Sequence, residues 1–130
     1  MIEGIGVDIV SPQKIESAVK RWGDSFLERV FNSQELASLN NKGKIYYQRI
    51  AARFAAKEAV FKALSKKYNL ALKDILITNL PNGAPICKFK NDLNLEVKVS
   101  ISHIEEYAVA VALAVKKNYE LERNSDQKKT

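Results

Sequence analysis

Apolar residues alternate with small or polar ones over the first ten positions, which is the pattern of a β-strand. The alternation would place Ile5, Val7 and Ile9 together on one face of the strand. Two glycines and Asp8 would then share the opposite face. Missing side chains beside a carboxylate leave room either for a ligand or for a backbone segment that approaches closely.

A helix is predicted after this strand, and its start is well marked. Ser11-Pro12 is typical of an N-cap followed by proline in the first helical turn. The helix would run to about Trp22 and end at Gly23. A short apolar segment at 24–31 and a short helix over 33–41 are expected to follow.

The longest helix is predicted over about residues 45–67, an alanine-rich run without internal glycine or proline. At 100° per residue, four of its apolar side chains fall in one stripe about 80° wide that would face the core. They are Ile50, Phe54, Phe61 and Leu64. Glu58 and Lys62 lie on one flank of this stripe, and Arg49 and Arg53 lie on the other.

Beyond residue 69 the apolar pattern changes to a period of two, which predicts strands joined by hairpin turns. The predicted strands are 75–80, 86–90, 95–102 and 108–115. The long helix would cover the apolar face of their antiparallel sheet, so an α+β fold is expected. Residues 1–117 would form a single domain, and residues 118–130 a polar, charged tail.

The composition is that of an ordinary globular domain, with 130 residues of which 46% are hydrophobic. No apolar run approaches the roughly 20 residues of a membrane-spanning helix, and the first residues lack the basic end and apolar core of a signal peptide. A cytoplasmic protein without a membrane partner is therefore expected. Because the chain has one cysteine and one histidine, carboxylates would have to hold any metal, which favours a hard cation such as Mg²⁺.

The net charge of +6 is concentrated in one segment. Residues 44–67 contain seven basic residues and the single acid Glu58, while the rest of the chain has 14 positive and 14 negative residues. Such a localised excess indicates a phosphate-rich or acidic partner. A nucleic-acid-binding module is one alternative, but the phenylalanines of the long helix lie in its core stripe and not among the bases. A structural interaction protein is another alternative, but this function does not explain why Asp8 stands beside two glycines.

Two acids are unusual in their surroundings. An acid in an apolar strand, as at Asp8, is costly unless it is paired, metal-bound or solvated, and the simpler alternative is that it caps the following turn. Glu58 is the one acid among seven bases, and its simpler alternative is a surface ion pair with Lys62. If the two carboxylates converge between strand and helix, they could hold one Mg²⁺ that also contacts phosphate oxygens.

Other candidate residues have ordinary structural interpretations when each is taken alone. His103, at the end of a predicted strand, is most simply a hydrogen-bonding residue. Gly83 and Pro85 are most simply turn residues, and Cys87 is most simply a small core residue.

Four motifs stand in order along the chain. They are GIGVDIV at 4–10, RFAAKEAVFKAL at 53–64, NGAP at 82–85 and VSISHIEEYAVAVAL at 99–113. Together they resemble the first-strand, long-helix, Gly-x-Pro and Ser-x-Ser-His motifs of the holo-[acyl-carrier-protein] synthases, a family of the 4′-phosphopantetheinyl transferase superfamily. One departure is the Ser-Lys-Lys segment at 65–67, which stands where the family has a Gly-rich turn.

The resemblance implies the fold of that superfamily, with a long helix packed on a mainly antiparallel sheet. It implies a transferase that moves the 4′-phosphopantetheine arm of coenzyme A to a serine of apo acyl carrier protein, in fatty acid biosynthesis, and releases adenosine 3′,5′-bisphosphate. Asp8 and Glu58 would bind Mg²⁺, and Lys62 would stabilise charge on the bridging pyrophosphate oxygens. The base that takes the serine proton would be Asp8, Glu58 or a water held by the metal, and the sequence does not choose among them.

The resemblance also implies a site for each substrate. Coenzyme A would be bound by Lys57, Lys62, Gly83, Pro85, Ser102 and His103. The acidic carrier protein would dock on Lys14, Lys20, Arg21 and Arg53. Family members of this short type form homotrimers with active sites between subunits, so a homotrimer is the expected assembly. No nucleic-acid or membrane partner is expected.

Overall fold

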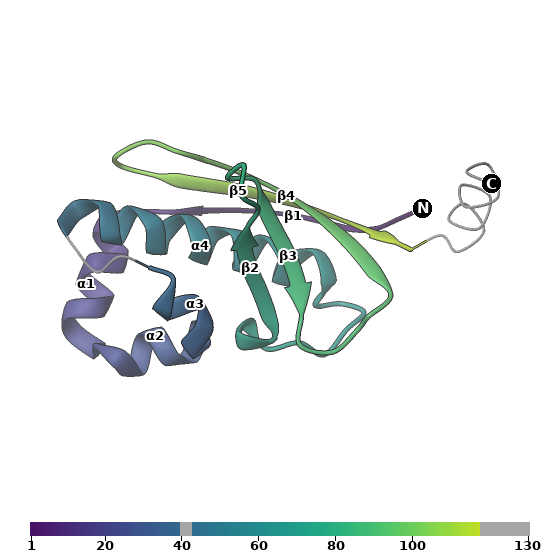
Figure 1. The fold of residues 1–130 in the computed structure, drawn as a ribbon, viewed down its shortest axis with the longest axis horizontal. Helices are drawn as coiled ribbons and strands as arrows, with labels where there is room; N and C mark the ends of the chain where they lie inside the picture. Colours follow the sequence, from purple (N-terminus) through teal and green to yellow (C-terminus); the bar gives the residue numbers. More distant parts are fainter. Residues whose placement is uncertain (40–42, 118–130) are drawn as a thin grey trace.

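The computed structural model describes residues 1–39 and 43–117 of the chain (Figure 1). The elements in chain order are β1 (Ile2–Val10), α1 (Pro12–Trp22), α2 (Asp24–Val30), α3 (Ser33–Ala37), α4 (Gly43–Leu64), a 3-10 helix (Leu72–Asp74), β2 (Ile75–Asn79), β3 (Pro85–Phe89), β4 (Leu95–His103) and β5 (Ala108–Lys116). The long helix thus ends at Leu64, one turn earlier than predicted. The tail predicted for 118–130 lies outside the described residues. No helix within the described ranges is both long and apolar enough to cross a membrane.

The strands form two antiparallel sheets, whereas a single sheet was predicted for the second half of the chain. β5 is the central strand of a three-stranded sheet, with β1 on one side and β4 on the other. β2 and β3 form a separate hairpin. Alternation along a strand shows which side chains share a face but does not show which strand lies beside it. The α+β class is confirmed.

α4 is the centre of the fold. One side of it lies along the three-stranded sheet, and other sides contact β2 and α1 (Figure 1). The predicted core stripe is therefore only partly correct, because Ile50 and Leu64 are buried while Phe54 and Phe61 remain partly exposed. Since several elements surround α4, it also buries a set of alanines, namely Ala51, Ala55, Ala56 and Ala59.

Two glycines let β1 and α4 approach each other closely. A Cβ atom at Gly4 would lie 1.9 Å from the carbonyl oxygen of Ala63, and a Cβ atom at Gly6 would lie 1.9 Å from that of Ala59. Both distances are far inside van der Waals contact, so only glycine fits at these positions. Of the two explanations for these glycines, room for a ligand or for a close backbone, the structure shows the second.

The opposite face of the three-stranded sheet is apolar and exposed. Ile5, Val7 and Ile9 point away from α4 and are 69%, 57% and 60% exposed. Their cross-strand neighbours on β5 continue this surface, and Val111, opposite Val7, is also exposed. A single copy of the chain thus leaves an apolar sheet face open to solvent, which is typical of a surface that another protein covers.

Candidate active site

Asp8 and Lys62 form an ion pair across the contact between β1 and α4. The Lys62 ammonium donates to Asp8 Oδ1 at 3.0 Å and to the Val7 carbonyl oxygen at 3.2 Å. The two glycines of β1 bring the strand close enough to the helix for this contact. The cost of placing an acid in an apolar strand is therefore offset by a basic partner.

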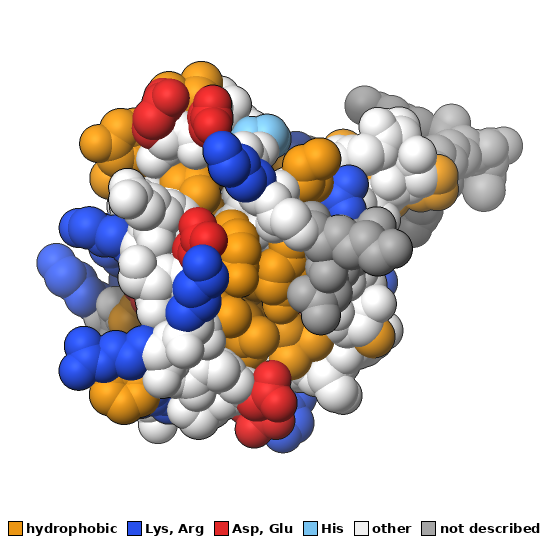
Figure 2. All heavy atoms as spheres, turned by 90° about the vertical axis from the view of Figure 1, so that its left-hand side faces the viewer, with side chains coloured by type: hydrophobic (Ala, Val, Ile, Leu, Met, Phe, Trp, Pro, Cys, Tyr) orange, Lys and Arg blue, Asp and Glu red, His pale blue; other side chains and the backbone are white. Residues whose placement is uncertain are grey.

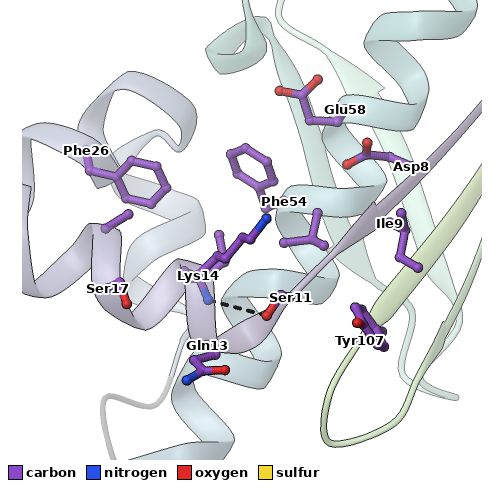
Figure 3. A pocket seen from close by; sticks show the side chains of 13 residues that line it. Asp8, Ile9, Ser11, Gln13, Lys14, Ser17, Phe26, Phe54, Glu58 and Tyr107 are labelled. Atoms are coloured by element: carbon purple, nitrogen blue, oxygen red, sulfur yellow. Dashed lines mark hydrogen bonds between the residues drawn. The ribbon is translucent and has the colours of Figure 1, made fainter.

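Glu58 lies one helical turn before Lys62 and beside Asp8. The two acids line one open pocket of about 860 Å³, which we call the carboxylate pocket, between β1, α1 and α4 (Figure 3). Burial and the neighbouring Asp8 carboxylate raise the pKa of Glu58 above its usual value, and the Lys62 ammonium opposes this shift. Phe54 and Lys14 line the same pocket.

The simpler alternatives for the two acids do not describe the structure. The residue that caps α1 is Ser11 and not Asp8, because the Ser11 hydroxyl accepts a hydrogen bond from the Lys14 amide at 3.4 Å. Lys62 reaches across to Asp8 on the strand, so its ion pair is not the expected one with Glu58 on its own helix. Both acids are thus turned toward the carboxylate pocket.

The donor atoms of the carboxylate pocket fit a magnesium ion. Mg²⁺ takes oxygen ligands and usually keeps several waters, so two carboxylates with an open side are sufficient. A cation would also relieve the repulsion between the two acids that contributes to the raised pKa of Glu58. The described parts of the chain contain no cluster of three or more His, Cys, Asp or Glu residues. A metal here would therefore depend on Asp8, Glu58 and oxygen atoms from water or substrate.

Lys57 lies in the core and not at the carboxylate pocket. Its side chain is fully buried, and its ammonium pairs with Glu35 at 2.5 Å. Burial lowers the pKa of Lys57, and the hydrogen bond with Glu35 opposes this shift. A contact between Lys57 and the phosphates of coenzyme A was predicted, and the structure places this ammonium in the core, paired with Glu35 and away from the carboxylate pocket.

The sequence pattern did not indicate the role of Glu35. This acid completes a capping box with Asn32 at the start of α3. Its second carboxylate oxygen accepts a hydrogen bond from the Ile77 amide of β2 at 3.3 Å. The Asn-x-x-Glu spacing is the signal that could have identified the cap. One buried carboxylate thus ties α3, α4 and β2 together.

Arg53 points toward β2. Its guanidinium donates to the Ile77 carbonyl oxygen at 2.8 Å and to Asn79 Oδ1 at 2.7 Å. Partial burial lowers the pKa of Arg53. Because two of its nitrogen atoms are engaged inside the chain, Arg53 does not fit the predicted contact with a carrier protein.

The other residues predicted to bind coenzyme A lie apart from the carboxylate pocket. Gly83 belongs to the turn between β2 and β3, and Pro85 begins β3. Ser102 and His103 are exposed at the end of β4. None of these four residues lines the carboxylate pocket. One chain, in its described parts, does not bring all the predicted coenzyme A residues together.

A sequence model of the 4′-phosphopantetheinyl transferase superfamily matches residues 4–112. The chain belongs to this superfamily. A holo-[acyl-carrier-protein] synthase of Thermodesulfovibrio yellowstonii is 42% identical over 111 residues, which cover 85% of this chain and 96% of that protein. Another, from Caldicellulosiruptor saccharolyticus, is 43% identical over 124 residues, which cover 89% of this chain and 98% of that protein.

Solved structures of the superfamily share the fold. A crystal structure of a holo-(acyl-carrier-protein) synthase from Bacillus anthracis, in complex with CoA (3′,5′-ADP), has a TM-score of 0.78 and 34% identity over 90% of this chain and 99% of that chain. The Helicobacter pylori holo-[acyl-carrier-protein] synthase, in complex with coenzyme A, has a TM-score of 0.75 and 36% identity over 85% of this chain and 99% of that chain. The expected phosphopantetheinyl transferase fold is confirmed.

In this transferase the basic residues of α1 lie at one end of the molecule. Lys14 lines the carboxylate pocket. Lys20 pairs with Glu16 at 2.9 Å. The Arg21 guanidinium carbon lies 4.9 Å from the centre of the Trp22 ring. Figure 2 views this end and shows basic side chains separated by polar and acidic ones around an apolar centre, so the surface is mixed and not uniformly basic.

Proposed function

We propose that this chain is a holo-[acyl-carrier-protein] synthase that transfers the 4′-phosphopantetheine arm of coenzyme A to a serine of apo acyl carrier protein. The products are holo carrier protein and adenosine 3′,5′-bisphosphate, and the process served is fatty acid biosynthesis in the cytoplasm. The observation that carries the proposal is the meeting of Asp8, Glu58 and Lys62 between β1 and α4. The coenzyme A named in two related structures supports the choice of substrate.

The reaction is attack of the serine hydroxyl oxygen on the phosphorus atom that bears the pantetheine arm. A phosphorus–oxygen bond to serine forms, and the bond from that phosphorus to the bridging oxygen of the pyrophosphate breaks. The serine proton has to be accepted, and the negative charge that develops on the leaving phosphate has to be stabilised. Both tasks fall to the charged groups of the carboxylate pocket.

Asp8 and Glu58 would hold Mg²⁺, which when bound neutralises phosphate oxygens and acidifies bound water. Glu58 is the better placed of the two acids to accept the serine proton, because one oxygen of Asp8 already accepts a hydrogen bond from Lys62. Positioned carboxylates of this kind act as general bases when the proton lies within hydrogen-bond reach.

Lys62 would stabilise charge on the bridging oxygens of the pyrophosphate. Its ammonium is held by Asp8 and by the Val7 carbonyl, while 53% of its side chain stays exposed to an incoming phosphate. A charge that is already in place stabilises the developing phosphate charge without a cost of reorganisation.

Lys14, Lys20 and Arg21 on α1 would form the docking surface for the acidic carrier protein. Lys14 also lines the carboxylate pocket, so a carrier bound along α1 would have its serine near the two acids. Arg53 is not part of this surface, because its guanidinium is bound to β2. Lysine and arginine at such a surface attract an acidic partner and speed its association.

A homotrimer with active sites between subunits belongs to the same proposal. The exposed apolar face of the three-stranded sheet supports self-association, because it is a surface that a second copy can cover. The separation of Gly83, Ser102 and His103 from the carboxylate pocket within one chain also supports it. A neighbouring subunit could supply these residues to the pocket.

The direct test is incubation of the full chain with coenzyme A, Mg²⁺ and the cognate apo carrier protein, followed by intact-mass measurement of the carrier. We expect each carrier molecule to gain one phosphopantetheine and an equal amount of adenosine 3′,5′-bisphosphate to be released. A chelator should stop the transfer, and added Mg²⁺ should restore it. A folded enzyme that leaves the carrier mass unchanged would contradict the proposal.

Removal of either pocket carboxylate should abolish most of the activity. We expect Asp8→Asn and Glu58→Gln each to lower kcat/KM at least about a hundredfold, because each removes a charge that acts on the transition state. The matched control is Glu28→Gln, an exposed acid on α2, which should keep full activity. Circular dichroism would check folding. Magnesium-dependent turnover that survives in both pocket variants would show that the metal site lies elsewhere.

A further inference from the structure

A chain of hydrogen bonds runs from α4 to the turn between β2 and β3. Arg53 donates to the Ile77 carbonyl oxygen at 2.8 Å and to Asn79 Oδ1 at 2.7 Å. The Asn79 amide nitrogen donates in turn to the Gly83 carbonyl oxygen at 2.8 Å. Arg53 precedes Glu58 on α4 by five residues. The same helix therefore carries one acid of the carboxylate pocket and the link to the turn.

Arg53 and the Gly83 carbonyl together fix the orientation of the Asn79 amide. A guanidinium only donates hydrogen bonds, so the oxygen of Asn79 has to face Arg53. The amide nitrogen of Asn79 then faces the Gly83 carbonyl, which only accepts. Without Arg53 only the Gly83 carbonyl would orient the amide, so the link to the turn would be weaker.

The turn between β2 and β3 depends on such support because little of it is buried. Leu80 and Gly83 are exposed, and Gly83 has a backbone φ of +90°, which other residues rarely adopt. Two backbone hydrogen bonds close the turn, from the Gly83 amide to the Leu80 carbonyl and from the Leu80 amide to the Ala84 carbonyl, both at 2.8 Å. The side chain of Asn79 adds a contact from the end of β2 to this turn, and through Asn79 the turn is linked to Arg53 on α4.

We propose that Arg53 is a positioning residue for coenzyme A, acting through Asn79 on the turn that carries Gly83. This inference rests on the proposed function and on the coenzyme A contacts of Gly83 and Pro85 that the family resemblance implies. An arginine suits the task because its planar fork reaches two acceptors on one strand, whereas the single ammonium of a lysine would not hold both in the same geometry.

Steady-state kinetics of the full chain with coenzyme A and apo carrier protein tests the proposal. Arg53→Lys and Asn79→Ala should each raise the KM for coenzyme A about tenfold, which corresponds to the loss of a strong hydrogen bond. The kcat and the KM for the carrier should change by less than about twofold. The matched control is Arg49→Lys, an exposed arginine four residues earlier on α4, which should leave both KM values unchanged.

Two further measurements test the relay through Asn79. Because both residues act through one link, the double variant should be no worse than Arg53→Lys alone. Amide hydrogen exchange at Gly83 and Ala84 should be faster in both single variants. If the KM for the carrier rises and the KM for coenzyme A does not, Arg53 is a docking residue and the proposal is overturned. A rise in the KM for coenzyme A with Arg53→Lys that Asn79→Ala does not share would also overturn it.

The exchange experiment uses no substrate, so it separates this inference from the proposed function. A wild-type chain that transfers no phosphopantetheine defeats the proposed function, and the role in coenzyme A binding falls with it. Unchanged exchange at the turn in both variants, with active wild-type enzyme, defeats the relay alone.

Discussion

Lys57 carries its charge into the interior of the protein, where Glu35 balances it. Both side chains are almost completely buried. Taking two charges out of water costs several kcal/mol for each ion, so such a pair seldom adds net stability, but removal of one partner leaves the other uncompensated. The pair therefore specifies how α3 and α4 are placed, because any other arrangement would bury an unpaired charge.

Breaking the buried pair should destabilise the protein strongly. We expect Glu35→Gln and Lys57→Met each to lower the free energy of unfolding by about 3 kcal/mol, and the double variant to lose less than the sum of the two. Urea denaturation followed by circular dichroism measures this. The control is the exposed pair of Glu16 and Lys20, whose disruption should cost less than about 1 kcal/mol. An equally small loss of unfolding free energy for the buried pair would show that its two charges are not shielded from water in the folded protein.

Asp8 and Glu58 could be found in the sequence because each is unusual where it stands, one in an apolar strand and the other among bases. Lys57 could not be interpreted in the same way. It is adjacent to Glu58, and nothing local shows that α3 and β2 lie on its side of the helix. Its predicted contact with phosphate rested on its charge and on the resemblance, and neither of these indicated the buried pair with Glu35.

The contact between β1 and α4 sets the geometry of the carboxylate pocket at the scale of whole elements. The glycine face of β1 lies against the helix and the isoleucine face is exposed, because carbonyl groups of α4 occupy the space that side chains would need. Alternation predicted correctly which residues share a face of β1. It could not predict that the face with the two glycines is the buried one.

A methyl group at Gly6 should separate the strand from the helix. Its Cβ would lie 1.9 Å from a backbone oxygen that cannot move alone, so Gly6→Ala should lower the free energy of unfolding by about 3 kcal/mol. Transfer activity should fall as well, because Asp8 and Lys62 sit on the two elements that would be pushed apart. Thermal unfolding and the carrier assay measure these two effects.

The control for this variant is Gly23→Ala. Gly23 has open space around its Cβ position, so this change tests backbone strain alone, which at a φ of +58° and a ψ of −137° should cost about 1–3 kcal/mol and leave transfer activity unchanged. Full transfer activity in Gly6→Ala would show that β1 and α4 can adjust to the extra methyl group.

At the scale of the whole molecule, the basic excess at 44–67 does not form one basic surface. Lys57 is buried, Lys62 and Lys67 pair with acids of β1, and Arg53 donates to β2. A charge that is concentrated in the sequence of a helix is thus distributed around its axis in the structure. The excess in sequence was a weak guide to a surface for the partner, and the proposed docking surface lies on α1.

Docking on α1 should respond to charge and salt. We expect Arg21→Glu to raise the KM for the carrier about tenfold at low ionic strength, with little change in the KM for coenzyme A, and the difference to shrink in high salt. Lys73→Glu, an exposed charge reversal near β2, is the control. If the KM for the carrier changes with neither the substitution nor the salt concentration, the docking surface lies elsewhere.

The apolar sheet face should hold copies of the chain together. Val7 lies at its centre and is 57% exposed in a single chain, so Val7→Glu would bury an unpaired charge in the assembly and should yield monomers. Light scattering coupled to size-exclusion chromatography measures the mass. Gln34→Glu adds the same charge at an exposed position of α3 and should leave the measured mass unchanged. A wild-type chain that is already monomeric would contradict the trimer.

The pairing of β1 with β5 joins segments from opposite ends of the described chain. Ile5 lies opposite Leu113, 108 residues later. During synthesis β1 therefore has no neighbouring strand until β5 has left the ribosome, and their pairing closes a loop that contains nearly every other element. Asp8 is part of this late pairing. The strand that carries Asp8 therefore finds its partner strand only after α4, which carries Glu58, and β2 to β4 have been made.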